Sequence, residues 1–266
     1  MTPEAKQTTP EPGSSTPGGS RWRGRVALVT GASSGIGCEI VRELTRAGMR
    51  VAFCARRRAR LEALAQELPD AQSSLPLVCD LQDEVQIAAM FAELRARWDG
   101  VDVLVNNAGF ARGASLLDGA SSDWRAILEV NVLALAICSR EAIADMRRRD
   151  VAGHVINLSS MAAHRVPVGS AMYSASKYAV RSLTEGLRGE LRAMDSAIRV
   201  TAISPGYVET EFALAATGDP EHARRTYARY PCLQAGDIAR TVRFALDAPP
   251  HMQVHDILIR PTRQPL

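Results

Sequence analysis

Lysine is almost absent from this chain of 266 residues. Of its 32 basic residues only Lys6 and Lys177 are lysines, which leaves 30 arginines (32 − 2). Lys6 lies in a polar N-terminal segment, so the body of the protein contains a single lysine. That lysine belongs to the stretch YSASK, four residues after Tyr173, and its use at this one position requires a chemical reason.

Long apolar runs, paired cysteines and concentrated charge are also missing. The longest apolar run, residues 132–138, is too short to span a bilayer, and no apolar signal core opens the sequence. Five widely separated cysteines without a CxxC spacing favour free thiols over disulfides or a metal site. The net charge of +3 is not focused on one segment, which argues against nucleic acid or membrane partners. We therefore expect a cytoplasmic protein that binds no metal.

The chain alternates short apolar runs with longer amphipathic segments from residue 25 onward, after a leader, residues 1–20, whose composition predicts disorder. Strands are expected at 25–30, 50–55, 75–79, 101–105, 154–159, 198–203 and 256–259. Helical segments are expected at 35–48, 57–68, 83–98, 122–149, 172–194 and about 210–246. The alternation predicts an α/β fold over residues 21–266, a single doubly wound Rossmann domain with a parallel sheet of about seven strands and helices on both faces.

A glycine-rich stretch, TGASSGIG at residues 30–37, joins the first expected strand to the first helix. In such a turn, free backbone N–H groups and the positive end of the helix dipole stabilise a pyrophosphate. The glycine spacing departs from GxGxxG, and glycines also serve turns without ligands, but the flanking strand and helix favour a dinucleotide site. The residues expected to contact the cofactor here are Gly31, Ser33, Ser34, Gly35, Ile36 and Gly37.

The end of the second strand lacks the acidic residue that sites for NAD use to bind the adenosine 2'-hydroxyl. Ala55 stands there instead, followed by Arg56, Arg57 and Arg58. Guanidinium groups form charged, bidentate hydrogen bonds with phosphate, so Arg56 and Arg57 predict NADP(H) as the cofactor. The alternative is a solvated helix start, although cations are slightly unfavourable at a helix N-terminus.

Tyr173 and Lys177 lie four residues apart on an expected helix and therefore project from the same face. Two unit charges about 4 Å apart interact by roughly 4 kcal/mol at an effective dielectric constant near 20, before desolvation is subtracted. We therefore expect the Lys177 ammonium to lower the pKa of Tyr173 toward the working pH of an acid–base catalyst. A compact ammonium can also donate hydrogen bonds to ribose hydroxyls while it acts on the phenol.

The motifs TGASSGIG, NNAG at residues 106–109 and YSASK, taken in order and spacing, resemble those of the classical short-chain dehydrogenase/reductase family. The resemblance runs from about residue 24 to the C-terminus. It implies a catalytic set of Asn131, Ser160, Tyr173 and Lys177, with Ser159 as the competitor of Ser160 and a helix kink as the alternative role of Asn131.

The same resemblance implies further cofactor contacts along the chain. Asp80 corresponds to the residue that contacts adenine, and Thr210 corresponds to the one that holds the nicotinamide carboxamide. The full set consists of Asp80, Leu81, Asn107, Ala108, Gly109, Pro205, Gly206, Val208 and Thr210, together with Tyr173 and Lys177.

Substrate choice in this family depends on two variable stretches, here residues 161–172 and 209–232, the second of which is expected to be a mobile lid. Ser160, His164, Tyr207 and Phe212 are the expected substrate contacts, with a place on the loop surface as the alternative for His164. Details such as NVLALAIC and SPGYVETEFA resemble the branch that contains dehydrogenase/reductase family member eleven and insect farnesol dehydrogenases. This branch implies a bulky, apolar carbonyl or secondary alcohol substrate, such as a ketosteroid or an isoprenoid.

Two other functions stay open on the sequence alone. One is a 3-oxoacyl-thioester reductase, for which Arg224, Arg225 and Arg229 offer a basic entrance. The other is an NADP-sensing regulatory protein without catalysis, against which the intact tyrosine, serine and lysine argue. By resemblance, the helices at 122–149 and 172–194 pair across a two-fold axis, so a homotetramer is expected first and a dimer second.

Overall fold

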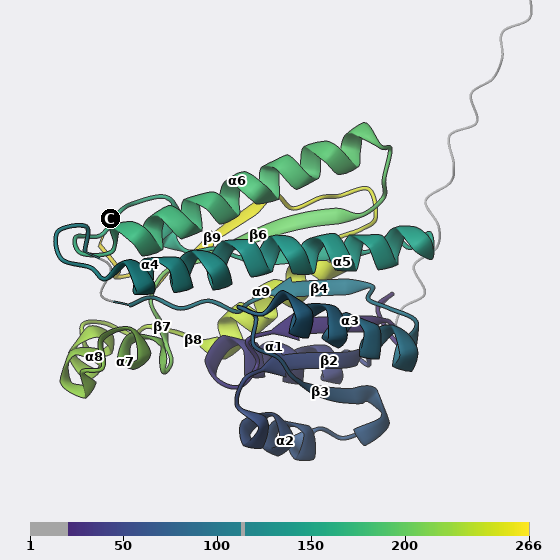
Figure 1. The fold of residues 1–266 in the computed structure, drawn as a ribbon, viewed down its shortest axis with the longest axis horizontal. Coiled ribbons are helices and arrows are strands. Elements are labelled where there is room, and N and C mark those ends of the chain that lie inside the picture. Colours follow the sequence, from purple (N-terminus) through teal and green to yellow (C-terminus); the bar gives the residue numbers. More distant parts are fainter. Residues whose placement is uncertain (1–20, 113–114, 266) are drawn as a thin grey trace, which may run out of the picture.

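The computed structural model describes residues 21–112 and 115–265, so the expected leader, residues 1–20, lies outside the described residues. Seven parallel strands form the central sheet in the order β3-β2-β1-β4-β5-β6-β9 (Figure 1). The strands are β1 (Val26–Thr30), β2 (Arg50–Ala55), β3 (Ser74–Val78), β4 (Val103–Asn106), β5 (His154–Leu158), β6 (Arg199–Pro205) and β9 (Asp256–Ile259). The expected doubly wound sheet is confirmed.

Helices cover both faces of this sheet, which explains why its strands are almost continuously apolar. The helices are α1 (Gly35–Arg46), α2 (Arg58–Glu67), α3 (Glu84–Trp98), α4 (Ser121–Leu128), α5 (Leu135–Arg148), α6 (Ala171–Ala193), α7 (Phe212–Thr217), α8 (Pro220–Ala228) and α9 (Ala235–Asp247). One core lies between the sheet and α1, α2 and α9, and the other lies between the sheet and α3, α5 and α6. Within the described residues, no helix has the length and apolar composition needed to cross a membrane.

Two expected helical segments are not single helices. A π-helical turn, Glu129–Ala134, separates α4 from α5 within the segment expected as 122–149. The segment expected as about 210–246 is divided into α7, α8 and α9, because Gly218 ends α7 with φ 68° and Pro220 opens α8. Two short strands, β7 (Val208–Glu209) and β8 (Leu233–Gln234), pair in parallel before α7 and after α8. Between them, α7 and α8 project from the body of the domain (Figure 1).

The turn after β1 packs against the segment after β4 with no room for side chains. Gly31 adopts φ 70°, and a Cβ added to it would lie 2.7 Å from the Cα of Ala108. A Cβ on Gly37 would lie 2.5 Å from the carbonyl oxygen of Gly31 and 2.7 Å from Asn107 Nδ2. The two segments are therefore held in direct backbone contact.

Replacing Gly37 with alanine is expected to lower the free energy of unfolding by about 1–3 kcal/mol, because the methyl group meets backbone that cannot move aside. Gly236→Ala is the matched control, since its methyl group meets only Arg240 Nη1 at 3.5 Å. That control should change stability by about 0.5 kcal/mol or less. Urea unfolding followed by circular dichroism measures both changes, and equal midpoints for the two variants would contradict the packing argument.

Candidate active site

The carboxyl ends of three neighbouring strands bring the expected site residues to one edge of the sheet. Gly31 follows β1, Asn107 follows β4, and Ser160 lies two residues beyond the end of β5. These strands are adjacent and parallel, so the segments that follow them emerge side by side. In doubly wound sheets this edge is where ligands bind.

Tyr173 lies in the first turn of α6, opposite the loop that follows β5. Its hydroxyl lies near the Ser160 side chain, which acts to lower the pKa of the phenol. The Ser160 hydroxyl also accepts a hydrogen bond from the Ala162 backbone N–H at 3.0 Å, which fixes its position at the start of a short 3-10 turn. Ser159 is buried instead and donates to the Lys177 carbonyl oxygen at 3.3 Å. The structure thus brings Ser160, and not Ser159, to the phenol.

Lys177 lies one turn further along α6 and is buried beneath Tyr173. Its Nζ is 5.9 Å from the centroid of the Tyr173 ring and donates a hydrogen bond to the Leu158 carbonyl oxygen at 2.8 Å. A Cβ on Gly109 would lie 3.3 Å from this Nζ and 3.2 Å from Asn131 Oδ1. Lys177, Asn131 and the NNAG segment therefore surround the same small space.

Burial controls the protonation of both α6 side chains. It raises the pKa of Tyr173 to about 12, and the nearby Ser160 side chain only partly opposes this rise. Burial also lowers the pKa of Lys177 to about 8. The expectation that the ammonium lowers the pKa of Tyr173 is therefore wrong for the protein alone, because desolvation disfavours both charged forms.

Asn131 lies in the π-helical turn and holds the backbone that follows the NNAG segment. Its amide nitrogen donates to the Phe110 carbonyl oxygen and to Ser176 Oγ, both at 3.0 Å, and its Oδ1 accepts from the Phe110 N–H at 3.0 Å. The Ser176 hydroxyl in turn donates to the Tyr173 carbonyl oxygen. Asn131 thus lies within an irregular helix and also close to Lys177, and its catalytic role stays a prediction.

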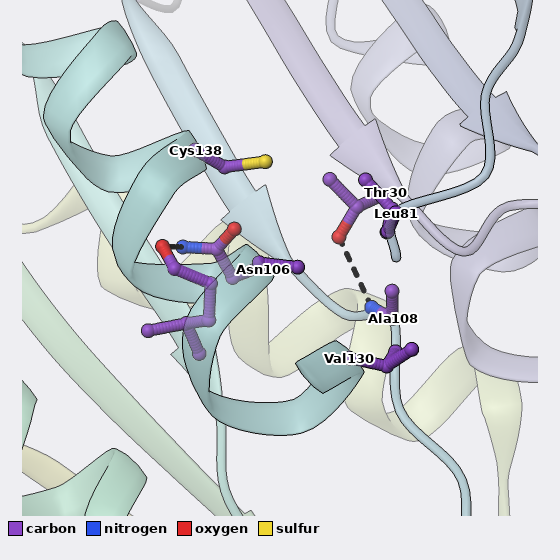
Figure 2. A pocket seen from close by; sticks show the side chains of 8 residues that line it. Thr30, Leu81, Asn106, Ala108, Val130 and Cys138 are labelled. Atoms are coloured by element: carbon purple, nitrogen blue, oxygen red, sulfur yellow. Dashed lines mark hydrogen bonds between the residues drawn. The ribbon is translucent and has the colours of Figure 1, made fainter. Parts of the chain in front are cut away.

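Thr30 connects the glycine-rich turn to the NNAG segment. Its Oγ1 accepts from the N–H groups of Asn107 and Ala108 at 3.1 and 3.0 Å, and the second bond is drawn in Figure 2. Asn107 Nδ2 returns hydrogen bonds to the carbonyl oxygens of Thr30 and Gly31 at 2.9 and 3.1 Å. Leu81 lines the same small pocket (Figure 2). Thr30 was not among the predicted residues, although it opens the motif TGASSGIG.

The arginines after β2 differ in their contacts. Arg57 Nη2 donates to Ser33 Oγ at 2.7 Å and to Ser34 Oγ at 2.8 Å, so this guanidinium lies over the glycine-rich turn. Arg56 is exposed and forms no hydrogen bond or ion pair with any described residue. Positive side chains beside a turn of free N–H groups, with Ala55 where an acid would repel phosphate, fit a phosphorylated dinucleotide.

The segment after β6 carries the last expected cofactor contacts. Pro205 ends β6 and Val208 opens β7. Gly206 allows close approach, since a Cβ there would lie 2.7 Å from the Cβ of Arg260. The Thr210 methyl carbon lies 3.1 Å from where a Cβ of Gly35 would be, so this segment reaches the glycine-rich turn.

Two further expected cofactor contacts lie beside the same sheet edge: Asp80 follows the end of β3 by two residues, and Ile36 lies in the first turn of α1.

The expected substrate contacts divide into two groups. Phe212 lies beside Tyr173, with ring centroids 5.7 Å apart, while Tyr207 packs edge-on against Tyr230 in the lid at 6.4 Å. His164 does not join them: its Nε2 is 3.2 Å from Ser204 Oγ and 3.6 Å from Asp256 Oδ2, against β6 and β9. The expectation that His164 reaches the substrate pocket is therefore replaced by a role in anchoring its loop to the sheet.

The chain matches the short chain dehydrogenase family over residues 25–220 and belongs to that family. It is 50% identical over 251 residues to dehydrogenase/reductase SDR family member 11 of Bos taurus, covering 92% of this chain and 98% of the relative. Farnesol dehydrogenase of Aedes aegypti is 42% identical over 247 residues, with coverage of 91% and 97%. The closed form of a serine dehydrogenase complexed with NADP+ superposes with a TM-score of 0.85 at 33% identity, covering 91% of this chain and 96% of that one. The family and branch expected from the motifs are confirmed.

Replacing Lys177 with methionine is expected to raise the free energy of unfolding of the protein alone by about 2 kcal/mol at pH 7, because a buried charge is removed. The folded-state pKa of about 8 lies below the ordinary lysine value of 10.5, so the unfolded chain binds more protons between these pH values. Wild-type stability therefore gains from this group as the pH rises from about 8 to 10.5. Urea unfolding at pH 7 and pH 10 should show the gap between the two proteins shrinking, and a constant gap would contradict the assignment.

Proposed function

We propose that this short-chain dehydrogenase is an NADP(H)-dependent enzyme that interconverts a carbonyl compound and a secondary alcohol. One observation carries the proposal: Tyr173 lies near Ser160 and 5.9 Å from the Nζ of a buried Lys177, at the sheet edge that also carries the glycine-rich turn. The arginines after β2 and the serine dehydrogenase complexed with NADP+ support the choice of cofactor.

In the reductive direction, Tyr173 donates its proton to the carbonyl oxygen, which becomes the alcohol oxygen. A pKa raised by burial keeps the phenol protonated at neutral pH, as a general acid requires. Ser160 hydrogen-bonds the same oxygen and stabilises the negative charge that develops there. When bound, the dihydronicotinamide supplies the hydride that reduces the carbonyl carbon.

Lys177 restores the proton of Tyr173 in this proposal. With a pKa of about 8, the buried lysine exchanges a proton near neutral pH far more readily than an ordinary lysine. Asn131, next to Lys177, orients the surrounding backbone and is positioned to hold a water molecule that connects the lysine to solvent. The scarcity of lysine elsewhere in the chain agrees with a chemical role that arginine, with its much higher pKa, does not fill.

A bulky, apolar substrate suits the walls of the site. Phe212 borders Tyr173 directly, and both Phe212 and Leu214 are partly exposed at 38% and 41%, at the start of the lid. Apolar and aromatic walls with few polar groups favour ketosteroids or isoprenoids over small polar carbonyls. The similarity to farnesol dehydrogenase supports the isoprenoid class. An assay panel of ketosteroids, isoprenoid aldehydes, diketones and acyl thioesters with NADPH separates these possibilities.

We also propose assembly as a homotetramer, with a dimer as the second choice. The helices expected at the interface carry exposed apolar side chains on the described surface, namely Leu128, Leu133, Tyr178 and Leu183 at 38–49% exposure. Apolar side chains gathered on long antiparallel or crossing helices are typical of a face covered by a second copy.

Replacing Tyr173 with phenylalanine is expected to lower kcat/KM about a thousandfold, because a phenylalanine ring has no hydroxyl proton to donate. The affinity for NADP+, measured by isothermal titration calorimetry, should stay within about threefold. Tyr178→Phe, a change of the same kind on the exposed side of α6, is the control and should leave turnover within about twofold. Full activity of the Tyr173 variant would refute the proposed mechanism.

NADPH is expected to support a kcat/KM at least about tenfold higher than NADH, and Arg57→Gln should remove about tenfold of that preference through loss of charged hydrogen bonds to phosphate. Arg58→Gln is the control, because Arg58 is exposed, pairs with Glu62 at 3.7 Å and forms no hydrogen bond with the described residues of the glycine-rich turn. Steady-state kinetics with both cofactors tests this, and a clear preference of the wild-type enzyme for NADH would remove the cofactor proposal.

A further inference from the structure

An ion-pair cluster of Glu211, Arg57 and Arg60 joins the start of the lid to the segment after β2. Arg60 Nη1 donates to the two carboxylate oxygens of Glu211 at 2.9 and 2.7 Å, and Arg57 Nη1 approaches Oε2 at 3.4 Å. The hydrogen bonds from Arg60, more than those from Arg57, keep the pKa of Glu211 below its ordinary value. The carboxylate is therefore charged at neutral pH, and all three side chains are close to half exposed.

The contacts of this cluster and of the glycine-rich turn use four of the five N–H donors of Arg57. Its Nε and Nη2 donate to Ser33 Oγ, Nη2 also donates to Ser34 Oγ, and Nη1 faces Glu211. Every guanidinium nitrogen of Arg57 is thus directed at an oxygen of the protein. A phosphate that binds Arg57 through two N–H donors must take over at least one of these, and it would then lie beside the like charge of Glu211 unless Glu211 moves.

The neighbours of Glu211 in the chain reach the two other parts of the site. Thr210 lies against Gly35 of the glycine-rich turn, and Phe212 lies against Tyr173. Arg60 and Glu211 are 151 residues apart in sequence, so their ion pair holds the lid start onto a different part of the domain. Because Glu211 lies directly before α7, movement of its side chain away from Arg60 would release the start of the lid.

We propose that Glu211 is a specificity-determining residue whose carboxylate occupies the arginine donors that the 2'-phosphate of NADP(H) takes. Binding of the 2'-phosphate then displaces Glu211 from Arg57 and Arg60 and frees the start of the lid. NAD(H) carries a hydroxyl at this position, which cannot compete with a carboxylate for two guanidinium groups, so it leaves the cluster in place. This inference rests on the NADP(H) use proposed above.

The opposite role for Glu211 makes the opposite prediction. If the carboxylate only oriented the two arginines toward the phosphate, its removal would weaken phosphate binding. If it competes with the phosphate, its removal strengthens that binding. The sign of the change in affinity therefore separates a competitor from a positioning residue.

Isothermal titration calorimetry on the full chain tests the competition with two probes, 2',5'-ADP and 5'-AMP, which differ in the 2'-phosphate and lack the nicotinamide. Glu211→Gln is expected to bind 2',5'-ADP on the order of fivefold more tightly than wild type at low salt, with 5'-AMP affinity within about twofold. Glu62→Gln is the control, because it removes one carboxylate charge from α2, the helix that contains Arg60, and Glu62 pairs with Arg58 instead of Arg57 or Arg60. This control should stay within about twofold for both probes.

Two results would overturn the inference, namely weaker binding of 2',5'-ADP by Glu211→Gln, or a change no larger than that of Glu62→Gln. The proposal of NADP(H) as the cofactor is tested separately by the wild-type protein. It fails if the wild-type protein binds 2',5'-ADP no more tightly than 5'-AMP.

Limited trypsin digestion measures how readily the lid opens, and it needs no catalytic assay. In the absence of nucleotide, cleavage after Arg224, Arg225 or Arg229 should be about threefold faster in Glu211→Gln than in Glu62→Gln, because the cluster no longer holds the lid start. Saturating 2',5'-ADP should accelerate the same cleavage in wild type, whereas 5'-AMP should not. Equal cleavage rates under these conditions would contradict the release of the lid.

Discussion

Direct backbone contact between the glycine-rich turn and the NNAG segment positions every other group at the sheet edge. Gly31 and Gly37 lack the side chains that would separate these segments, and Thr30 and Asn107 join them through four hydrogen bonds. The same segment continues to Gly109, which touches the space shared by Lys177 and Asn131. The surface that receives the cofactor and the acid–base groups is therefore one continuous structure.

Desolvation, rather than attraction between neighbouring charges, determines the chemistry of α6. A lysine and a tyrosine on one helix face suggest a phenolate stabilised by an ammonium, but both groups are taken out of water and become harder to ionise. This favours a neutral phenol that donates a proton and a lysine that titrates close to neutral pH. The Leu158 carbonyl oxygen, which accepts from Lys177, keeps the amine directed beneath the ring.

Much of the fold and of the site could be predicted because it depends on local patterns. The last strand, DILI, was placed at its observed bounds, and the i, i+4 spacing of Tyr173 and Lys177 brought both to one face. The π-helical turn was missed because one extra residue hardly alters an apolar helical pattern. The Glu211–Arg60 ion pair could not be predicted, since no local signal relates residues 151 apart in sequence. His164 was misplaced for the same reason, because its partners lie on β6 and β9.

The π-helical turn Glu129–Ala134 makes the position of Asn131 depend on the number of residues in this segment as well as on their identity. Successive residues of a regular helix are rotated by about 100°, so loss of one residue from this turn would rotate α5 relative to α4 by about that angle. The Asn131 amide would then lose its hydrogen bonds with the Phe110 backbone, although the asparagine itself was unchanged. A deletion here would thus remove the Asn131 contacts while every expected site residue keeps its identity.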